Sequence, residues 1–485
     1  MKSKNVRAFT GKASYHKFDI ARGQLETAIR LFLTDGADMF SPIALAVTLE
    51  ISFMRWLCAP VSSPFRSDRG TFRVIRAGAA ALLLLFVIVA PASAQPEFNA
   101  QDRVADLDWL VDQIAAHYAY LPQRRLNLAK LRAIYRPQAE AAKTRVEWLH
   151  VLERVIVELH DHHATLGANV GDSPQLVPTG TDLWAEIDHG RATVSEVRPG
   201  GPAEAAGLQA GDIVVSIGGV EVRKAVADAL PKALASPDPE AANFTLRTLL
   251  AGTHVDMRRL VVRKSDGRLR GVRLAPYVPP QSDGPVSWRW LDAATGYIRL
   301  NNSLGDQGAV AAFDRALDAL QGAMGLILDL RDTPSGGNTS VAEPILGRFV
   351  VRPGGYQRVF DPGLGKRFPR DSWLKELNPR GPAIAARLVV LVDHWTGSMG
   401  EGMAIGLDGL HRATIVGTRM AGLSGGTGQF ALPRTGFTID LPVERLYHVD
   451  GRPRETFVPL VYVDLSQGPA RQDAILARGL AVLGR

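Results

Sequence analysis

The feature that most constrains the fold is an alternation of short apolar runs and amphipathic segments over residues 286–465. Residues 296–300, 325–330 and 388–392 each have the composition of a strand, and the last two are apolar enough to be buried. Residues 310–320 between them have the spacing of an amphipathic helix. Strands that alternate with helices predict a layered α/β domain.

The rest of the chain divides by changes in pattern. Residues 98–168 carry apolar side chains at helical spacing, and we expect a small helical domain there. Residues 176–278 consist of short β-like runs separated by Gly and Pro, which predicts a β-rich domain. A Pro-, Gly- and Ser-rich stretch at 278–285 marks a domain boundary, and residues 466–485 are expected to close the chain with a helix.

An export signal is predicted near the start of the chain. Three arginines precede an apolar run at residues 77–90, and an A-x-A site ends at Ala94. The run is shorter than the roughly 20 residues that a membrane-spanning helix needs, so we expect a signal peptide cleaved after Ala94. An uncleaved anchor is the alternative. The protein is therefore expected to be exported, periplasmic or secreted, and to meet the membrane only through this leader of residues 1–94.

Export signals rarely begin so far into a chain. Residues 1–53 are therefore expected to reflect a misassigned start, with Met54 as the true first residue.

The high pI of about 9.5 does not indicate a nucleic-acid-binding protein. Residues 1–94 carry a net charge of +6 of the chain's +7, which leaves +1 for everything after the leader. No strong basic run remains to attract nucleic acid. The one cysteine, Cys58, also lies in the leader, so we expect neither thiol chemistry nor disulfides in the mature chain.

The most specific motif lies at residues 201–217, GPAEAAGLQAGDIVVSI. It resembles the PDZ pattern GPAxxAGLxxGDxIxxI. The resemblance implies that an extended peptide adds as a strand to a sheet edge. It also places the loop that binds the peptide carboxylate at four residues, Thr181, Asp182, Leu183 and Trp184. A PDZ domain that only spaces or gates a second domain is the alternative.

Two strand ends in the α/β segment carry candidate chemistry. The run 329–338, DLRDTPSGGN, takes a strand into a Pro–Gly turn whose free N–H groups could stabilise an oxyanion. A second strand ends at Asp393, and a helix of small residues begins near Ser398. A helix N-terminus favours developing negative charge at such a serine. On local sequence alone, a plain tight turn is equally open at the first strand end, and an N-cap serine is the favoured reading at the second.

Together these motifs resemble the tail-specific, or C-terminal processing, protease family and its tricorn-core relatives. The resemblance covers residues 100–465 in the order helical segment, PDZ domain, catalytic domain. DLRDTPSGG is similar to the family's DLRxNPGG, and TGSMGE is similar to SASASE, which places the nucleophile on Ser398. The resemblance implies a ClpP/crotonase-like α/β catalytic domain without a cofactor. It also implies an oxyanion hole made by Met399 and by the turn at Ser335 and Gly336.

One departure from the family is informative. The tail-specific branch uses a Ser–Lys dyad, with the lysine in a glycine-rich loop after the serine. Here that loop, residues 417–427, has no lysine, and Leu423 stands at the expected position. Arg419 cannot serve as the base because a guanidinium does not lose its proton in a protein. The chain is therefore expected to be closer to the tricorn-like branch.

That branch suggests a different base. The run LHDHHATL is similar to the tricorn-like LxDGHT, and His163 takes the place of the motif's histidine. Histidine has a suitable pKa for a base near neutral pH. A tricorn-like site also uses a glutamate after the last hairpin, for which Glu455 is the candidate and Glu444 a weaker one. Either glutamate could instead be a solvated surface carboxylate.

The three histidines at 160, 162 and 163 allow two other readings. With Asp161 they could bind zinc, although no H-E-x-x-H motif is present, and we expect no metal site. They could also be a cluster without function. The expected activity is that of a serine endopeptidase acting on exported proteins or peptides held by the PDZ domain. A catalytically inactive peptide-binding protein on the same fold is the alternative.

Overall fold

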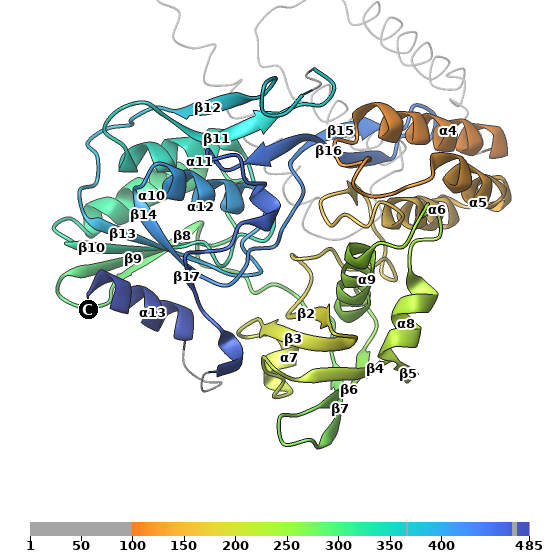
Figure 1. Ribbon diagram of the computed structural model, residues 1–485, viewed down its shortest axis with the longest axis horizontal. Helices are drawn as coiled ribbons and strands as arrows, with labels where there is room; N and C mark the ends of the chain where they lie inside the picture. Colours follow the sequence, from red (N-terminus) through yellow and green to blue (C-terminus); the bar gives the residue numbers. More distant parts are fainter. Residues whose placement is uncertain (1–98, 365–366, 468–472, 485) are drawn as a thin grey trace, which may run out of the picture. The chain divides into compact units, whose positions relative to one another are not determined.

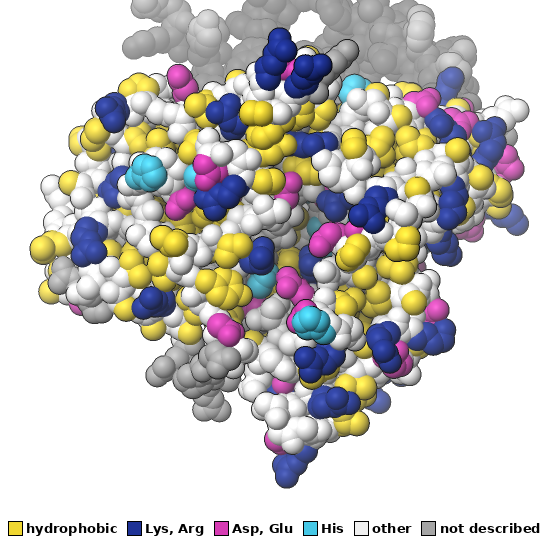
Figure 2. All heavy atoms as spheres, viewed as in Figure 1, with side chains coloured by type: hydrophobic (Ala, Val, Ile, Leu, Met, Phe, Trp, Pro, Cys, Tyr) yellow, Lys and Arg dark blue, Asp and Glu magenta, His cyan; other side chains and the backbone are white. Residues whose placement is uncertain are grey.

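The computed structural model describes residues 99–364, 367–467 and 473–484 (Figure 1). The predicted leader and the possible start at Met54 lie outside the described residues. Within those ranges, none of the helices combines the length and the hydropathy needed to cross a membrane. Acidic and basic side chains are interspersed over the face shown in Figure 2, and neither sign of charge dominates it.

Three helices open the described part: α4 (Ala100–His117), α5 (Leu128–Ala141) and α6 (Arg145–Val157). Each begins at a side chain that accepts a hydrogen bond from a first-turn N–H, namely Asn99, Asn127 and Thr144. Their apolar faces share one core with a distant hairpin formed by β15 (Gly426–Ala431) and β16 (Thr438–Tyr447). The short strand β1 (Thr165–Leu166) pairs with β16, so the helical segment is joined to the last third of the chain.

The next segment is an antiparallel sheet in the order β2-β3-β4-β6-β7, with β5 paired to β4. Its strands are β2 (Leu183–Asp188), β3 (Arg191–Val197), β4 (Ile213–Ile217), β5 (Val220–Glu221), β6 (Arg258–Arg263) and β7 (Leu269–Leu274). Its helices are α7 (Pro202–Ala205), α8 (Val222–Ala229) and α9 (Pro239–Ala251). The motif at 201–217 forms α7 and β4, and Gly207 between them has a φ of +73°, which glycine adopts without strain.

The last segment is built on a six-stranded sheet in the order β17-β14-β13-β10-β9-β8, parallel except for β8. Its strands are β8 (Val286–Trp290), β9 (Thr295–Leu300), β10 (Gly325–Asp329), β13 (Arg387–Val392), β14 (Ala413–Gly417) and β17 (Val461–Tyr462). Helices α10 (Gly308–Ala319), α11 (Thr339–Leu346) and α12 (Met399–Gly409) pack in one core against this sheet, and α13 (Ala474–Leu483) packs in a second (Figure 1). A second sheet adds β11 (Gly354–Phe360) and β12 (Trp373–Leu377) to β16.

The strands and helices expected at 296–300, 310–320, 325–330 and 388–392 are present as β9, α10, β10 and β13. The predicted order of opening helices, a β-rich segment and an α/β segment is confirmed. Parallel strands bring their carboxyl ends to one edge of the sheet, and ligands of such sheets bind outside that edge. The loops that follow β10, β13 and β14 begin there.

Candidate active site

Ser398 is the one partly exposed residue in a buried segment. From residue 388 to residue 407, through β13, its loop and most of α12, every residue except Ser398 is buried. Its φ of +49° and ψ of −108° lie where side chains other than glycine are strained. A sharp, strained strand-to-helix turn is the geometry on which nucleophilic serines are exposed in other α/β enzymes. The backbone thus presents this serine at the sheet edge.

Glu401 holds this turn in place. Its carboxylate accepts hydrogen bonds from the N–H groups of Ser398 (2.7 Å), Gly422 (3.0 Å) and Leu423 (3.2 Å). Glu401 is fully buried, and burial raises its pKa to about 7 despite these bonds and the nearby charge of Arg454. One side chain therefore ties the start of α12 to the loop that follows β14.

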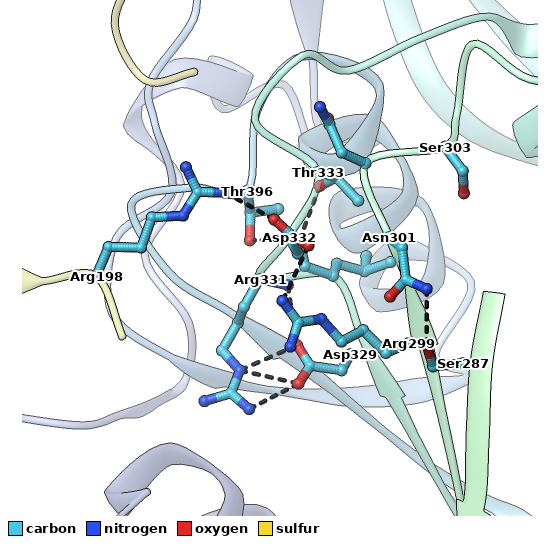
Figure 3. A network of polar contacts seen from close by, with 12 residues as sticks. Arg198, Ser287, Arg299, Asn301, Ser303, Asp329, Arg331, Asp332, Thr333 and Thr396 are labelled. Atoms are coloured by element: carbon cyan, nitrogen blue, oxygen red, sulfur yellow. Dashed lines mark hydrogen bonds and ion pairs between the residues drawn. The ribbon is translucent and has the colours of Figure 1, made fainter. Parts of the chain in front are cut away.

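The Pro–Gly turn after β10 contacts the serine directly. The Thr333 carbonyl accepts from the N–H groups of Gly336 (3.0 Å) and Gly397 (3.2 Å), and Thr333 and Thr396 form a parallel bridge, close together in Figure 3. Gly336 has a φ of +62°, and a Cβ placed on it would lie 2.8 Å from Ser398 Oγ. Only glycine therefore fits beside the serine.

The predicted oxyanion-hole donors need a correction. The Ser335 N–H donates to Asn302 Oδ1 at 3.0 Å, and the Gly336 N–H is used inside the turn, so neither points freely at a substrate. Within the described residues, the Gly337 N–H makes no hydrogen bond. The Met399 N–H opens α12 and has no acceptor within the helix. It lies 3.1 Å from the point where a Cβ on Gly336 would be, so Met399 remains well placed.

His163 is oriented by a backbone carbonyl. Its Nδ1 lies 2.5 Å from the Ser424 carbonyl oxygen, which can only accept, so Nδ1 carries the proton and Nε2 carries the lone pair. Burial lowers the pKa of His163, and the charge of Arg454 lowers it further. The neutral ring with a free Nε2 is the form that a general base requires. No hydrogen bond joins His163 to Ser398 in the part of the chain described.

The neighbouring histidines have other partners. His160 binds Asp238 Oδ2 at 3.1 Å and the Glu158 carbonyl at 3.2 Å. His162 stacks on Phe244 with ring centroids 4.3 Å apart. Among the described residues, no group of three or more His, Cys, Asp and Glu side chains gathers as at a metal centre. Of the three histidines, His163 alone binds the loop that follows β14.

Glu455 lies in the short helix η2 (Arg454–Thr456) and is largely withdrawn from solvent. Burial raises its pKa, and its Oε2 is buried without a partner. The described structure contains no hydrogen bond between Glu455 and His163, so the glutamate does not orient the ring directly. Glu444, on β16, is only partly buried, and burial likewise raises its pKa.

Sequence reasoning missed Glu401, Arg454 and Ser424. Arg454 is buried and donates to the carbonyls of Leu423 (2.9 Å) and Gly425 (2.8 Å). Glu401 could have been found, because Ser398 and Glu401 form the S-x-x-E spacing of a capping box. Arg454 and Ser424 act through backbone groups that the fold brings together. No local sequence pattern predicts these contacts.

The predicted peptide-carboxylate loop is buried in this structure. Thr181, Asp182, Leu183 and Trp184 are all enclosed. The Thr181 carbonyl accepts from Trp395 Nε1 at 2.8 Å, and Trp184 stacks on His394 with centroids 4.8 Å apart. Asp182 is paired with Arg258 at 2.6 Å. The loop that was expected to bind a peptide end packs instead against the loop that leads to Ser398.

Three polar contacts reinforce this packing. Glu196 of β3 lies 2.5 Å from His394 Nδ1 and accepts from Thr418 Oγ1 at 3.0 Å. Burial raises the pKa of Glu196 to about 7 and lowers that of His394 to about 3, so it favours the uncharged form of both side chains. Arg198 reaches Asp332 at 2.7 Å beside the turn that contacts Ser398 (Figure 3). The PDZ-type segment thus contacts both loops around the serine.

Known proteins resemble both the α/β segment that carries Ser398 and the β-rich segment that precedes it. Residues 294–458 match the sequence model of Peptidase family S41, and residues 193–248 match that of the PDZ domain. A "Carboxyl-terminal-processing protease" of Synechocystis sp. is 30% identical over 229 residues, which are 46% of this chain and 47% of that protein. The chain thus aligns with about half the length of this curated relative.

Solved structures agree in fold. The structure of mature CPAF has a TM-score of 0.52 at 16% identity, covering 79% of this chain and 96% of that one. Mature CPAF complexed with lactacystin has a TM-score of 0.51 at 16% identity, covering 79% and 97%. At such identities the likeness supports the fold alone. The sequence matches thus show that residues 294–458 are similar to Peptidase family S41 and that residues 193–248 are similar to the PDZ domain.

Proposed function

We propose that this protein is a serine-type endopeptidase in which Ser398 attacks the scissile carbonyl. The observation that carries the proposal is the backbone at Ser398, a strained turn that exposes one hydroxyl within an otherwise buried segment. Strain of this kind costs on the order of 1–3 kcal/mol and persists where the surrounding structure enforces it. Here Glu401 and the turn at Gly336 provide that enforcement.

His163 is the proposed base. Its Nε2 lone pair would accept the Ser398 proton, and its Nδ1–H would keep its bond to the Ser424 carbonyl. That bond is stronger to the charged imidazolium than to the neutral ring, so it stabilises the state formed during attack. In unliganded sites the bond between nucleophile and base is often long and shortens when substrate binds. The Nδ1–H tautomer favoured by this bond is the one that a base at His163 would need.

The tetrahedral oxyanion would be bound by main-chain N–H groups. Met399 supplies the amide that follows the nucleophile, and the positive end of α12 favours the charge at the same place. Gly337 supplies the free amide of the turn after β10. The loop at 417–427 contains no lysine, so we place the chain in the branch that uses histidine rather than lysine. Glu455 would act on the site without a direct hydrogen bond to His163.

The substrates proposed are exported proteins or peptides held in extended form by the PDZ domain. Strand β2 is an edge strand, the element to which an added peptide strand pairs. The docked loop at residues 181–184 would have to separate from Trp395 before it could receive a peptide carboxylate. An exported location, periplasmic or secreted, rests on the predicted leader.

Cleavage of an unfolded protein substrate, followed by mass spectrometry of the products, tests the proposal. Ser398→Ala should abolish cleavage, and His163→Ala should lower kcat on the order of 10²-fold or more. His162→Ala is the matched control, because that ring has a different partner, and it should lower kcat far less. Equal losses in both histidine variants would contradict the assignment of the base. A wild-type protein that binds but never cleaves would favour an inactive peptide-binding protein.

A further inference from the structure

The side chains that orient the proposed base form a closed, largely buried ring that joins two distant parts of the chain. Asp161 Oδ1 accepts from the His163 backbone N–H at 3.0 Å. Its Oδ2 accepts from Tyr118 Oη at 2.7 Å and lies 3.3 Å from Arg124 Nη2. The same Arg124 nitrogen donates to Ser424 Oγ at 2.9 Å, and the Ser424 carbonyl accepts from His163 Nδ1.

We infer that Arg124 and Ser424 are positioning residues that fix the tautomer and direction of the His163 imidazole. The inference rests on the proposed role of His163 as base and adds residues that no motif in the chain marks. Asp161 holds the backbone of the histidine, and Ser424 holds its ring. Arg124 is the bridge that keeps these two anchors at a fixed separation.

The arginine is suited to this bridge. A guanidinium presents several donors in one rigid plane, and Arg124 uses them on three partners, including Tyr118 Oη at 3.1 Å. Burial acts to raise the pKa of Asp161, but the Arg124 charge and the bonds from Tyr118 and the His163 amide bring it below its ordinary value. Asp161 is therefore ionised and holds Arg124 in place at working pH.

The loop that carries Ser424 is also held by two other side chains. Glu401 binds the N–H groups of Gly422 and Leu423 on one side of it. Arg454 binds the carbonyls of Leu423 and Gly425. Ser424 lies between these fixed points, and its side chain is bound only through Arg124 among the described contacts. Removing Arg124 would therefore remove the one described side-chain contact of Ser424, the residue whose carbonyl orients the base.

Three variants of the full chain test the inference: Arg124→Met, Ser424→Ala and the double variant. We expect Arg124→Met to lower kcat on the order of tenfold or more with little change in KM. Because both residues act through one contact, the double variant should lose no more than Arg124→Met alone. An additive loss, or a kcat within twofold of wild type in Arg124→Met, would overturn the inference.

A second readout does not depend on activity. The ¹⁵N shifts of the neutral His163 ring should show a proton on Nδ1 in the wild type and a mixture of tautomers in Arg124→Met. Asp106→Asn is the matched control. Asp106 is a buried carboxylate like Asp161, but it binds Thr435, which lies far along the chain from His163. It should destabilise the fold and leave the tautomer unchanged.

The two readouts separate the inference from the proposed function. A wild-type Nδ1–H tautomer that survives Arg124→Met overturns the inference even if His163 proves to be the base. A tautomer lost in Arg124→Met supports the positioning role even if the chain shows no peptidase activity.

Discussion

Replacing Ser398 with glycine should stabilise the protein while it removes the nucleophile. A side chain at φ +49° and ψ −108° costs on the order of 1–3 kcal/mol, and glycine adopts this conformation freely. Glycine also makes the unfolded chain more flexible, which costs about 0.4–1 kcal/mol. The net expectation is a gain of about 1 kcal/mol in the free energy of unfolding.

Ser398→Ala is the necessary comparison. Alanine removes the hydroxyl but keeps Cβ and therefore keeps the strain, so its stability should stay within about 0.5 kcal/mol of wild type. Ala404→Gly supplies the opposite control. That residue is buried inside α12, where glycine should cost about 1 kcal/mol or more. The measurement is the urea midpoint of all three variants at one pH.

The strain argument predicts the order Ser398→Gly, Ser398→Ala, Ala404→Gly from most to least stable. If Ser398→Gly were no more stable than Ser398→Ala, the turn would not be strained. The serine would then be an ordinary helix N-cap, and the main geometric support for a nucleophile at this position would be lost.

Three further variants probe the surroundings of the serine. Glu401→Gln leaves one acceptor oxygen for three N–H groups and should lower kcat on the order of tenfold. Because burial raises the pKa of Glu401 to about 7, the wild type loses stability as pH rises from about 4.5 to about 7, and the urea midpoint of this variant should lack that loss. Glu196→Gln should remove a similar loss of stability over the same pH range, because its pKa is also raised to about 7 by burial. Asp332→Asn leaves Arg198 without its partner carboxylate and should speed limited proteolysis in the linker at 278–285.

The sequence predicted the layers of the fold because each depends on local periodicity. The runs at 296–300, 325–330 and 388–392 are apolar over the length of a strand, and the amphipathic run at 310–320 has the spacing of a helix. Packing of the opening helices on the β15–β16 hairpin was not predictable. It depends on apolar contacts between residues some 300 positions apart, which leave no local signal.

The candidate site likewise contains features that the sequence predicts and features that it does not. Ser398 could be placed because the strand end, the small-residue helix and the family resemblance all fall on one residue. The sequence could not show that Ser335 and Gly336 donate their N–H groups to Asn302 and Thr333, because these bonds depend on how the chain folds around the turn. The burial of Trp184 was likewise hidden, because its partner His394 lies in another domain.

The central claim is that Ser398 is an activated nucleophile. Treatment of the full chain with a fluorophosphonate, followed by digestion and mass spectrometry, measures this directly, because the reagent forms a covalent adduct with an activated serine. The account predicts one adduct on Ser398, absent in Ser398→Ala and greatly slowed in His163→Ala. An adduct on another serine, or no adduct on the folded protein across pH 6–9, would contradict it.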